Sequence, residues 1–211
     1  MPLALDRSDA AILVVECQND LIHASRAAAK GVSGALARAV AERGVIPRFR
    51  SLIDTARAAS VPVLYATIEN RAGFAKPDCS IYRWSSKGEI LRPGTWGAEI
   101  HADLAPASGD LVLNRHTSVD PSYGSALWPT LRALRRKTLV VGGVSTNFAV
   151  EGTVRAAVNR LFRVVVVEDC CAAAGDGMHR FAVEKLLPLL ADVASAEGVK
   201  AALAARSEPA S

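Results

Sequence analysis

Five short apolar runs alternate along the chain with segments of helical periodicity, and this alternation constrains the fold more than any other feature. The runs are Ala11–Val15, Val61–Ile68, Asp110–Leu113, Thr138–Val141 and Phe162–Val167. Several of them are apolar on both faces, which is typical of strands that helices cover on each side. Strands that alternate with helices favour right-handed βαβ units. The sequence therefore predicts an α/β fold with a mostly parallel central sheet.

The segments between the runs show the spacing of amphipathic helices. One helix face is predicted from Val150, Val154, Ala157, Val158 and Leu161. A second face comes from Leu52, Ile53 and Ala56, and residues 178–190 are periodic as well. With 211 residues, half of them hydrophobic, we expect one domain over residues 1–211 with a sizeable core. The small, polar tail 204–211 is expected to fray.

Composition disfavours several classes of protein. The net charge of +4 is spread along the chain, and its one basic cluster, residues 132–137, is expected to cap a helix C-terminus. No aromatic platform accompanies that cluster, so we expect no nucleic-acid partner. No apolar run approaches membrane-spanning length and no secretion signal is visible. We therefore expect a cytoplasmic protein with reduced cysteines.

Several motifs occur together in one order. Val141–Thr153 runs from an apolar strand through a glycine pair into a helix start. It resembles the nucleophile turn of the isochorismatase-like cysteine hydrolases, roughly G-V-x-T-N-x-C-V-E-x-T. Further similarity lies in Ala11–Asp20 (family L-L-V-V-D-x-Q-N-D), Asp110–His116, Ser125–Leu127 (family S-A-F) and Val164–Asp169. The resemblance covers about residues 9–195 and implies a three-layer αβα fold with about six strands and a homo-oligomer, a dimer or tetramer.

The family's catalytic Asp, Lys and Cys fall on Glu16, Arg115 and Ala149, so the resemblance implies the frame of a hydrolase without its nucleophile. Alanine forms no covalent intermediate. The resemblance also implies that the backbone amides of Ser145 and Ala149 form an oxyanion hole, beside a Val144–Ser145 peptide that is often cis. A Cys→Ala change leaves these backbone features in place. A trap introduced at Ala149 alone would leave Asp and Lys at the other two positions.

The same residues converge without any family knowledge. Glu16, Arg115 and the turn from Ser145 to Ala149 each follow a predicted strand, and ligands of parallel sheets bind at the carboxyl ends of strands. If Arg115 contacts Glu16, it keeps the carboxylate ionised, which suits a base or a structural ion pair. If a substrate anion occupies Arg115 instead, Glu16 lies in a drier site and could donate a proton, as the aspartate of true isochorismatases does without a cysteine.

The segment 69–106 interrupts the rhythm of strands and helices. It is rich in Gly, Pro and charge, and segments of this length are usually lids, binding loops or interfaces. Flat apolar rings and a cation suit a pocket rim, so Tyr82, Arg83, Trp84 and Trp96 are candidates for substrate binding. The alternative is a surface excursion whose aromatic rings pack on the body of the domain.

Other reactive side chains are weaker candidates. His116 is expected to face away from Arg115, because neighbours on an extended segment point to opposite faces. Cys17 is expected to be a core thiol, whereas Cys170 and Cys171 follow a predicted strand end near the pocket. The metal-binding branch of the family carries histidines where this chain has Glu69–Arg71, so we expect neither metal nor cofactor.

Three functions remain open. The first is a hydrolase without a nucleophilic cysteine that acts on a small polar, anionic metabolite by acid/base chemistry from Glu16. The second is a catalytically silent binding or scaffold protein in which Glu16 and Arg115 form a salt bridge that fills the old site. The third is an isomerase or lyase that uses the same base and anion hole. Whether the pocket is open or closed by the two side chains separates these alternatives best.

Overall fold

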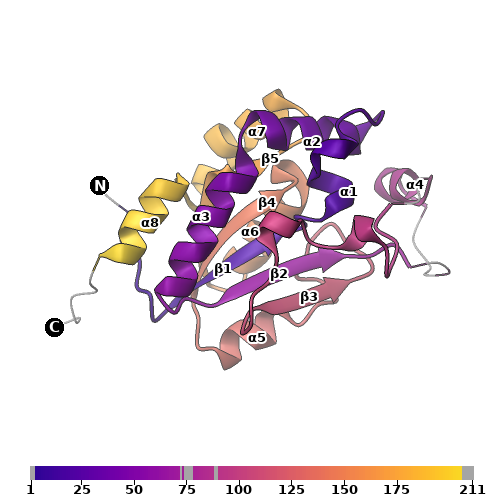
Figure 1. Cartoon of the computed structure of the whole chain (residues 1–211). Coiled ribbons are helices and arrows are strands. Elements are labelled where there is room, and N and C mark those ends of the chain that lie inside the picture. Colours follow the sequence, from indigo (N-terminus) through magenta and orange to yellow (C-terminus); the bar gives the residue numbers. More distant parts are fainter. Residues whose placement is uncertain (1–2, 72, 74–77, 88–89, 206–211) are drawn as a thin grey trace.

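The computed structural model describes residues 3–71, 73, 78–87 and 90–205, the side chains of 84–87 excepted (Figure 1). Six parallel strands form one sheet in the order β3-β2-β1-β4-β5-β6, which confirms the predicted fold class. The strands are β1 (Ala10–Val15), β2 (Val63–Ile68), β3 (Leu111–Arg115), β4 (Thr138–Val144), β5 (Arg163–Ala172) and β6 (Asp192–Ala194).

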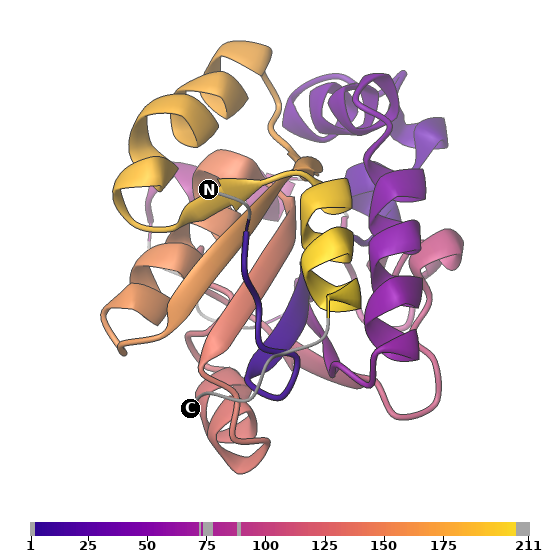
Figure 2. The same cartoon turned by 90° about the vertical axis from the view of Figure 1, so that its left-hand side faces the viewer.

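The helices form a layer on each face of the sheet. They are α1 (Asn19–Ile22), α2 (Val32–Glu42), α3 (Val45–Ala58), α4 (Ser80–Lys87), α5 (Leu127–Ala133), α6 (Glu151–Val158), α7 (Asp176–Phe181) and α8 (Ala196–Ala204). Figure 2 shows α3 and α8 on one face and α6 on the other. Short 3₁₀ turns lie at Ala24–Arg26, Trp96–Ala98, Ala102–Leu104 and Leu187–Leu189, and π-helical turns are η4 (Thr146–Val150) and η5 (Ala182–Leu186). None of the helices among these residues is long and apolar enough to cross a membrane.

Each face of the sheet has its own core. The side chains of β1 alternate between the two, so that Ile12 and Val14 pack with α2, α3 and α8, while Leu13 and Val15 pack with α5 and α6. All six residues of β1 are buried, as expected for a strand covered on both faces. The chain leaves β1 toward β2 on one side and later fills β4 on the other, so the strand order reverses beside β1. A crevice forms at the carboxyl ends of the strands at such a reversal.

The strand boundaries differ from those expected. Strand β2 begins at Val63 because Pro62 has no N–H to donate to its neighbour. Strand β3 includes Arg115, which therefore projects from the sheet itself. Strand β5 continues to Ala172, well past Val167, after a register irregularity against β4 between Val141 and Gly143. Strand β6 was missed, because three residues at a sheet edge carry no periodic signal.

Two helix predictions were wrong at their ends. Helix α6 ends at Val158, and Leu161 turns out to be 93% exposed with a left-handed φ of 64°, so it belongs to no helical face. The periodic segment 178–190 is broken into α7, η5 and a 3₁₀ turn that contains Pro188. A proline removes a helical N–H and obstructs the preceding turn, which explains the break.

Gly143 makes the close contact between β1 and β4 possible. Its φ is +126°, and a Cβ at this position would lie 2.1 Å from the backbone oxygen of Val15. No side chain fits there, because real Cβ atoms do not come within 3.0 Å of such atoms. The residue thus fixes the spacing of the two strands that carry the central crevice.

We predict that Gly143→Ala is far more destabilising than Gly109→Ala. Gly109 also has a positive φ, +95°, but a Cβ there would meet nothing within 4 Å. Gly109→Ala, the control, should therefore lower the free energy of unfolding only by the cost of the strained backbone, about 1–3 kcal/mol. Gly143→Ala should lower it by that cost and by the cost of separating two strands. Chemical denaturation measures both losses, and equal losses would contradict this account of Gly143.

Candidate active site

A pocket of about 390 Å³ opens at the carboxyl ends of β1, β2, β3 and β4. Its polar lining consists of Glu16, Asn70, Ser80, Tyr82, Arg115, Ser118 and Ser145. The strand ends that the sequence singles out, Glu16, Arg115 and the turn Ser145–Ala149, therefore do meet at one pocket. The pocket lies where the strand order reverses, which is the usual binding position in open α/β sheets.

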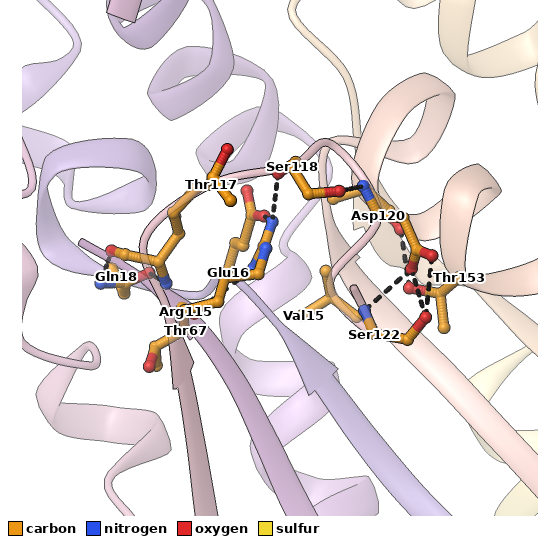
Figure 3. Close-up of polar contacts among 12 residues, drawn as sticks. Val15, Glu16, Gln18, Thr67, Arg115, Thr117, Ser118, Asp120, Ser122 and Thr153 are labelled. Atoms are coloured by element: carbon orange, nitrogen blue, oxygen red, sulfur yellow. Dashed lines mark hydrogen bonds and ion pairs between the residues drawn. The ribbon is translucent and has the colours of Figure 1, made fainter. Parts of the chain in front are cut away.

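A buried ion pair forms the polar part of this pocket. Arg115 is the last residue of β3, and its side chain is 1% exposed, while that of Glu16, just after β1, is 13% exposed. The Nη2 of Arg115 donates a hydrogen bond to the Oε1 of Glu16 and another, 3.2 Å long, to the carbonyl oxygen of Ser118 (Figure 3). Its Nη1 donates to the carbonyl of Thr67 at 3.3 Å. These contacts fix the guanidinium, and the guanidinium fixes Glu16.

The backbone of Glu16 is strained. Its φ of 50° lies in the left-handed region, which a residue with a Cβ adopts at a cost. The amide of Glu16 still bonds to Ala66 O at 2.8 Å, as part of the β1–β2 ladder. Strained residues persist where the surrounding structure over-determines them, and they cluster at functional sites. The twist turns the Glu16 side chain into the pocket, beside Arg115.

The turn after β4 supplies the opposite wall. Ser145 and Ala149 both line the pocket, and the Val144–Ser145 peptide is cis. A π-helical turn, η4, replaces the expected α-helical start, and the carbonyl of Ala149 accepts a 2.8 Å hydrogen bond from the Thr153 hydroxyl. The hydroxyl of Thr146, the first residue of this turn, bonds to Nδ1 of His179 at 2.9 Å.

His179 braces this turn from behind. It is buried, its Nδ1 faces the Thr146 hydroxyl, and its Nε2 lies 4.0 Å from Glu168 Oε2. Glu168 in turn pairs with Arg43 at 3.1 Å. Burial lowers the pKa of His179 to about 4, and the charge of Arg43 acts in the same direction. The ring is therefore neutral at neutral pH, and the sequence offered no signal for it beyond a lone histidine in a helix.

The segment predicted as a lid, 69–106, contributes α4 and two 3₁₀ turns. Tyr82 lines the pocket, and its hydroxyl accepts a 2.9 Å hydrogen bond from the amide of Ser118 and lies 3.1 Å from the Thr117 hydroxyl. It thereby ties α4 to the loop that follows β3. Since Ser118 also accepts from Arg115, Tyr82 holds the ion pair indirectly.

Other lid residues lie elsewhere. Arg83 pairs with Asp78 at 2.7 Å on the surface and is not part of the pocket lining. Trp96 is 45% exposed, with its ring against His23 and below the guanidinium of Arg26, so its expected place at the pocket rim was wrong. An aromatic ring in a long segment has no periodicity that shows its direction. The side chain of Trp84 lies outside the described residues.

His116 and the cysteines do not reach the pocket lining. His116 Nδ1 lies 3.9 Å from Glu69 Oε2. Cys17 is buried as expected, but Cys170 and Cys171 lie inside β5 rather than after it, and both are buried. Burial raises the pKa of all three thiols, that of Cys171 to about 12. Among the described residues, no group of three or more His, Cys, Asp or Glu could hold a metal.

The walls of the pocket were not foreseen from the sequence. Leu21, Val32 and Leu36 come from α1 and α2, and Ile81, Ile90 and Leu91 come from the segment around α4. Ile68, Val119 and Phe148 lie near the strand ends. Of these wall residues, Phe148 was the one with a signal in the sequence, because it lies in the middle of the turn motif next to Ala149. The others meet only in the folded chain.

A larger open hollow, about 870 Å³, lies beside the basic cluster and includes Arg132, Arg135 and Lys137. Arg136 in this hollow donates to the carbonyls of Arg7, at 3.0 Å, and Ser8. Asp9 accepts from the amide of Lys137. The cluster follows α5 at the amino ends of the strands, far from the ion pair. It serves to attach the N-terminal segment.

The family of the chain follows from comparison with known proteins. Residues 10–198 match the isochorismatase domain. The chain belongs to the isochorismatase family. Ureidoacrylate amidohydrolase RutB of Variovorax paradoxus is 31% identical over 187 residues, which cover 80% of this chain and 70% of that protein. RutB of Methylobacterium radiotolerans is 31% identical over 219 residues, covering 93% and 81%.

Solved structures of the family share the fold. An isochorismatase family protein from Desulfovibrio vulgaris superposes with a TM-score of 0.78 at 28% identity, covering 93% of this chain and 99% of that one. N-carbamoylsarcosine amidase from Thermoplasma acidophilum gives a TM-score of 0.68 at 25% identity, covering 90% and 97%. The three-layer architecture is therefore that of isochorismatase-fold hydrolases.

We predict that one thiol of four reacts rapidly in the folded protein. Cys79 is exposed, whereas Cys17, Cys170 and Cys171 are buried with raised pKa values and form little thiolate. A thiol-specific chromogenic reagent should titrate one equivalent within minutes at pH 8 and four in denaturant. Loss of the fast phase in Cys79→Ser identifies it, and a second fast thiol would contradict the burial of the other three.

We predict that His179 makes the protein less stable in weak acid. A histidine in the unfolded chain titrates near 6.5, so between about pH 6.5 and pH 4 the unfolded state binds more protons. Stability that is present above pH 6.5 is therefore lost as the pH falls through this window, by about 2–3 kcal/mol. His179→Gln should show a shallower decline in denaturation free energy between pH 7 and 4.5. Parallel curves for the two proteins would refute this.

Proposed function

We propose that residues 1–211 form one hydrolase domain that cleaves a carbonyl–nitrogen or carbonyl–oxygen bond with water as the nucleophile and Glu16 as the general base. The observation that carries the proposal is that Glu16 and Ala149 line one open pocket. At Ala149 the family's turn presents a methyl group where the resemblance implies a thiol. The methyl leaves space beside Glu16 in which a water molecule could stand.

The ion pair supports a base rather than an acid. Arg115 stabilises the negative charge of Glu16, and a carboxylate that is ionised can accept a proton from water. The water oxygen would then attack the carbonyl carbon, and charge would develop on the carbonyl oxygen. In the family's manner, the amides of Ser145 and Ala149 would stabilise that charge. As the carbon–heteroatom bond breaks, Glu16 returns its proton to the leaving group.

The sequence left two roles open for Arg115, pairing with Glu16 or anchoring a substrate anion. Its Nη2 is engaged by Glu16 and Ser118, which favours the first. We therefore assign it the task of holding and polarising Glu16. The names of the relatives support hydrolysis, since ureidoacrylate amidohydrolase and N-carbamoylsarcosine amidase both act on bonds of this class.

A silent scaffold is the second candidate, and one observation favours it. Glu16 and Arg115 contact each other and are buried, as a structural salt bridge would be. The pocket beside Glu16 and Arg115 is nevertheless open. A salt bridge that fills the old site would not require an open pocket. A lyase or isomerase could use the same base. That the protein is a homo-oligomer in the cytoplasm stays a prediction.

We predict that Glu16→Gln lowers turnover of an amide or ester substrate by about 10²–10⁴-fold, the usual contribution of a general base. The same change leaves the charge of Arg115 buried and uncompensated, which typically costs about 3–5 kcal/mol. Turnover and denaturation free energy are therefore measured together. Loss of activity alone would be ambiguous, because an unstable protein is also inactive.

The double variant Glu16→Gln with Arg115→Met separates the two causes. It removes both buried charges, so stability should return toward that of the parent while activity stays lost. If the double variant regains activity with its stability, Glu16 is not the base. If the parent turns over no member of an amide and ester panel, the hydrolase proposal is rejected.

A further inference from the structure

Most of the residues that line the pocket are apolar, and the ion pair is its charged part. Walls of leucine, isoleucine, valine and phenylalanine come from both sides, among them Leu21, Leu36, Ile81 and Phe148. Pockets for small molecules typically combine such walls with a few placed polar groups. Here Asn70, Ser118 and Ser145 lie near the strand ends that carry Glu16 and Arg115, and Ser80 and Tyr82 add polar groups from α4. A ligand would therefore have one polar end at the strands and an apolar body above it.

The charge of the pocket cancels within it. Of the described residues that line it, Glu16 and Arg115 are the charged ones, and they neutralise each other through a direct hydrogen bond. Arg115 also bonds to the carbonyls of Thr67 and Ser118. A substrate carboxylate would have to displace Glu16 or lie beside its like charge. Both are costly in an environment with little water.

We propose that this pocket selects an uncharged substrate with an aliphatic or other apolar acyl group, held with its carbonyl toward Glu16. The inference rests on the proposed function, since it identifies the substrate class of that site. Each methylene group that moves from water to the apolar walls makes the binding free energy more favourable. The ion pair has no net charge that would attract a free anion. The proposal differs in this respect from the anionic metabolite expected from the sequence.

The test uses ligands that cannot be hydrolysed. Calorimetric titration of the parent protein with butan-2-one, hexan-2-one and octan-2-one measures the gain from chain length. Each added methylene should tighten the dissociation constant about three- to four-fold until the pocket is filled, which corresponds to about 0.8 kcal/mol per methylene. Hexanoate and hexylammonium, of matched length, should bind at least about ten-fold more weakly than hexan-2-one.

A matched pair of variants ties the gain to the pocket. Phe148 lines it and is 46% exposed, whereas Phe181, at the end of α7, is 62% exposed and lies outside the lining. Phe148→Ala should weaken octan-2-one binding several-fold and reduce the dependence on chain length. Phe181→Ala should leave both unchanged. Equal effects would place the ketones elsewhere on the surface and overturn the proposal.

Glu16→Gln tests the charge argument directly. With its carboxylate partner gone, Arg115 becomes a cation available to the ligand, so hexanoate should gain at least about ten-fold in affinity while hexan-2-one changes little. Circular dichroism and a thermal melt confirm that the variant is folded at the temperature of titration. The double variant Glu16→Gln with Arg115→Met should lose this gain for hexanoate.

The outcomes also distinguish this inference from the proposed function. Ketone binding that rises with chain length, without turnover of any amide or ester, supports the apolar substrate class and rejects the hydrolase. Turnover of amides with hexanoate bound more tightly than hexan-2-one supports the hydrolase and rejects the substrate class. Ketone affinity that does not depend on chain length, or absent ketone binding, overturns the inference as well.

Discussion

The parallel pairing of β1 with both of its neighbours is the constraint on which the site depends. Four residues of β1 pair with β2 and six pair with β4, in registers that end together at Val15. Because all the strands run the same way, the residues that follow them must emerge at one edge of the sheet. Glu16, Arg115 and Ser145 therefore meet, although they are distant in sequence. Gly143 permits the approach that this pairing requires.

Within this frame, the ion pair holds the elements around the pocket. Arg115 contacts Glu16 after β1, Thr67 in β2 and Ser118 in the loop after its own strand. Tyr82 then ties that loop to α4. A buried ion pair repays the cost of leaving water only when further hydrogen bonds satisfy its members. Here the carbonyls of Thr67 and Ser118 accept from Nη1 and Nη2, while the buried Nε of Arg115 has no hydrogen-bond partner among the described residues. The pair therefore fixes the geometry of the pocket floor more than it adds stability.

The sequence predicted the sheet well and the pocket walls poorly, for physical reasons. Strands such as β1 and β5 are apolar on both faces, and that pattern reads directly as a buried parallel strand. Strand β6 has three residues and therefore no periodic signal. The π-turn η4 departs from α-helical spacing, so a helical pattern in the sequence does not reveal it. The strand-end rule alone located Glu16 and Arg115. Trp96 was misplaced, because composition shows that a ring must pack but not against which neighbour.

The walls of α2 and α4 were beyond any local pattern. Val32 and Leu36 form one apolar face of a helix, and the pattern does not distinguish a face on the core from one that borders a cavity. That difference arises only when separate elements meet. The proposed substrate class depends on the same packing of separate elements, because the polar residues of the site alone also suggested an anionic substrate.

The apolar walls and the buried ion pair act on each other. An apolar ligand that fills the pocket removes water from around Glu16 and Arg115, and the attraction between the two charges strengthens as the local dielectric constant falls. It also removes competing water, so that a single molecule held near Ala149 would remain as the nucleophile. Under the proposed function, substrate binding itself completes the site. A ligand too short to fill the walls would leave the pair hydrated, so we expect chain length to raise kcat as well as affinity.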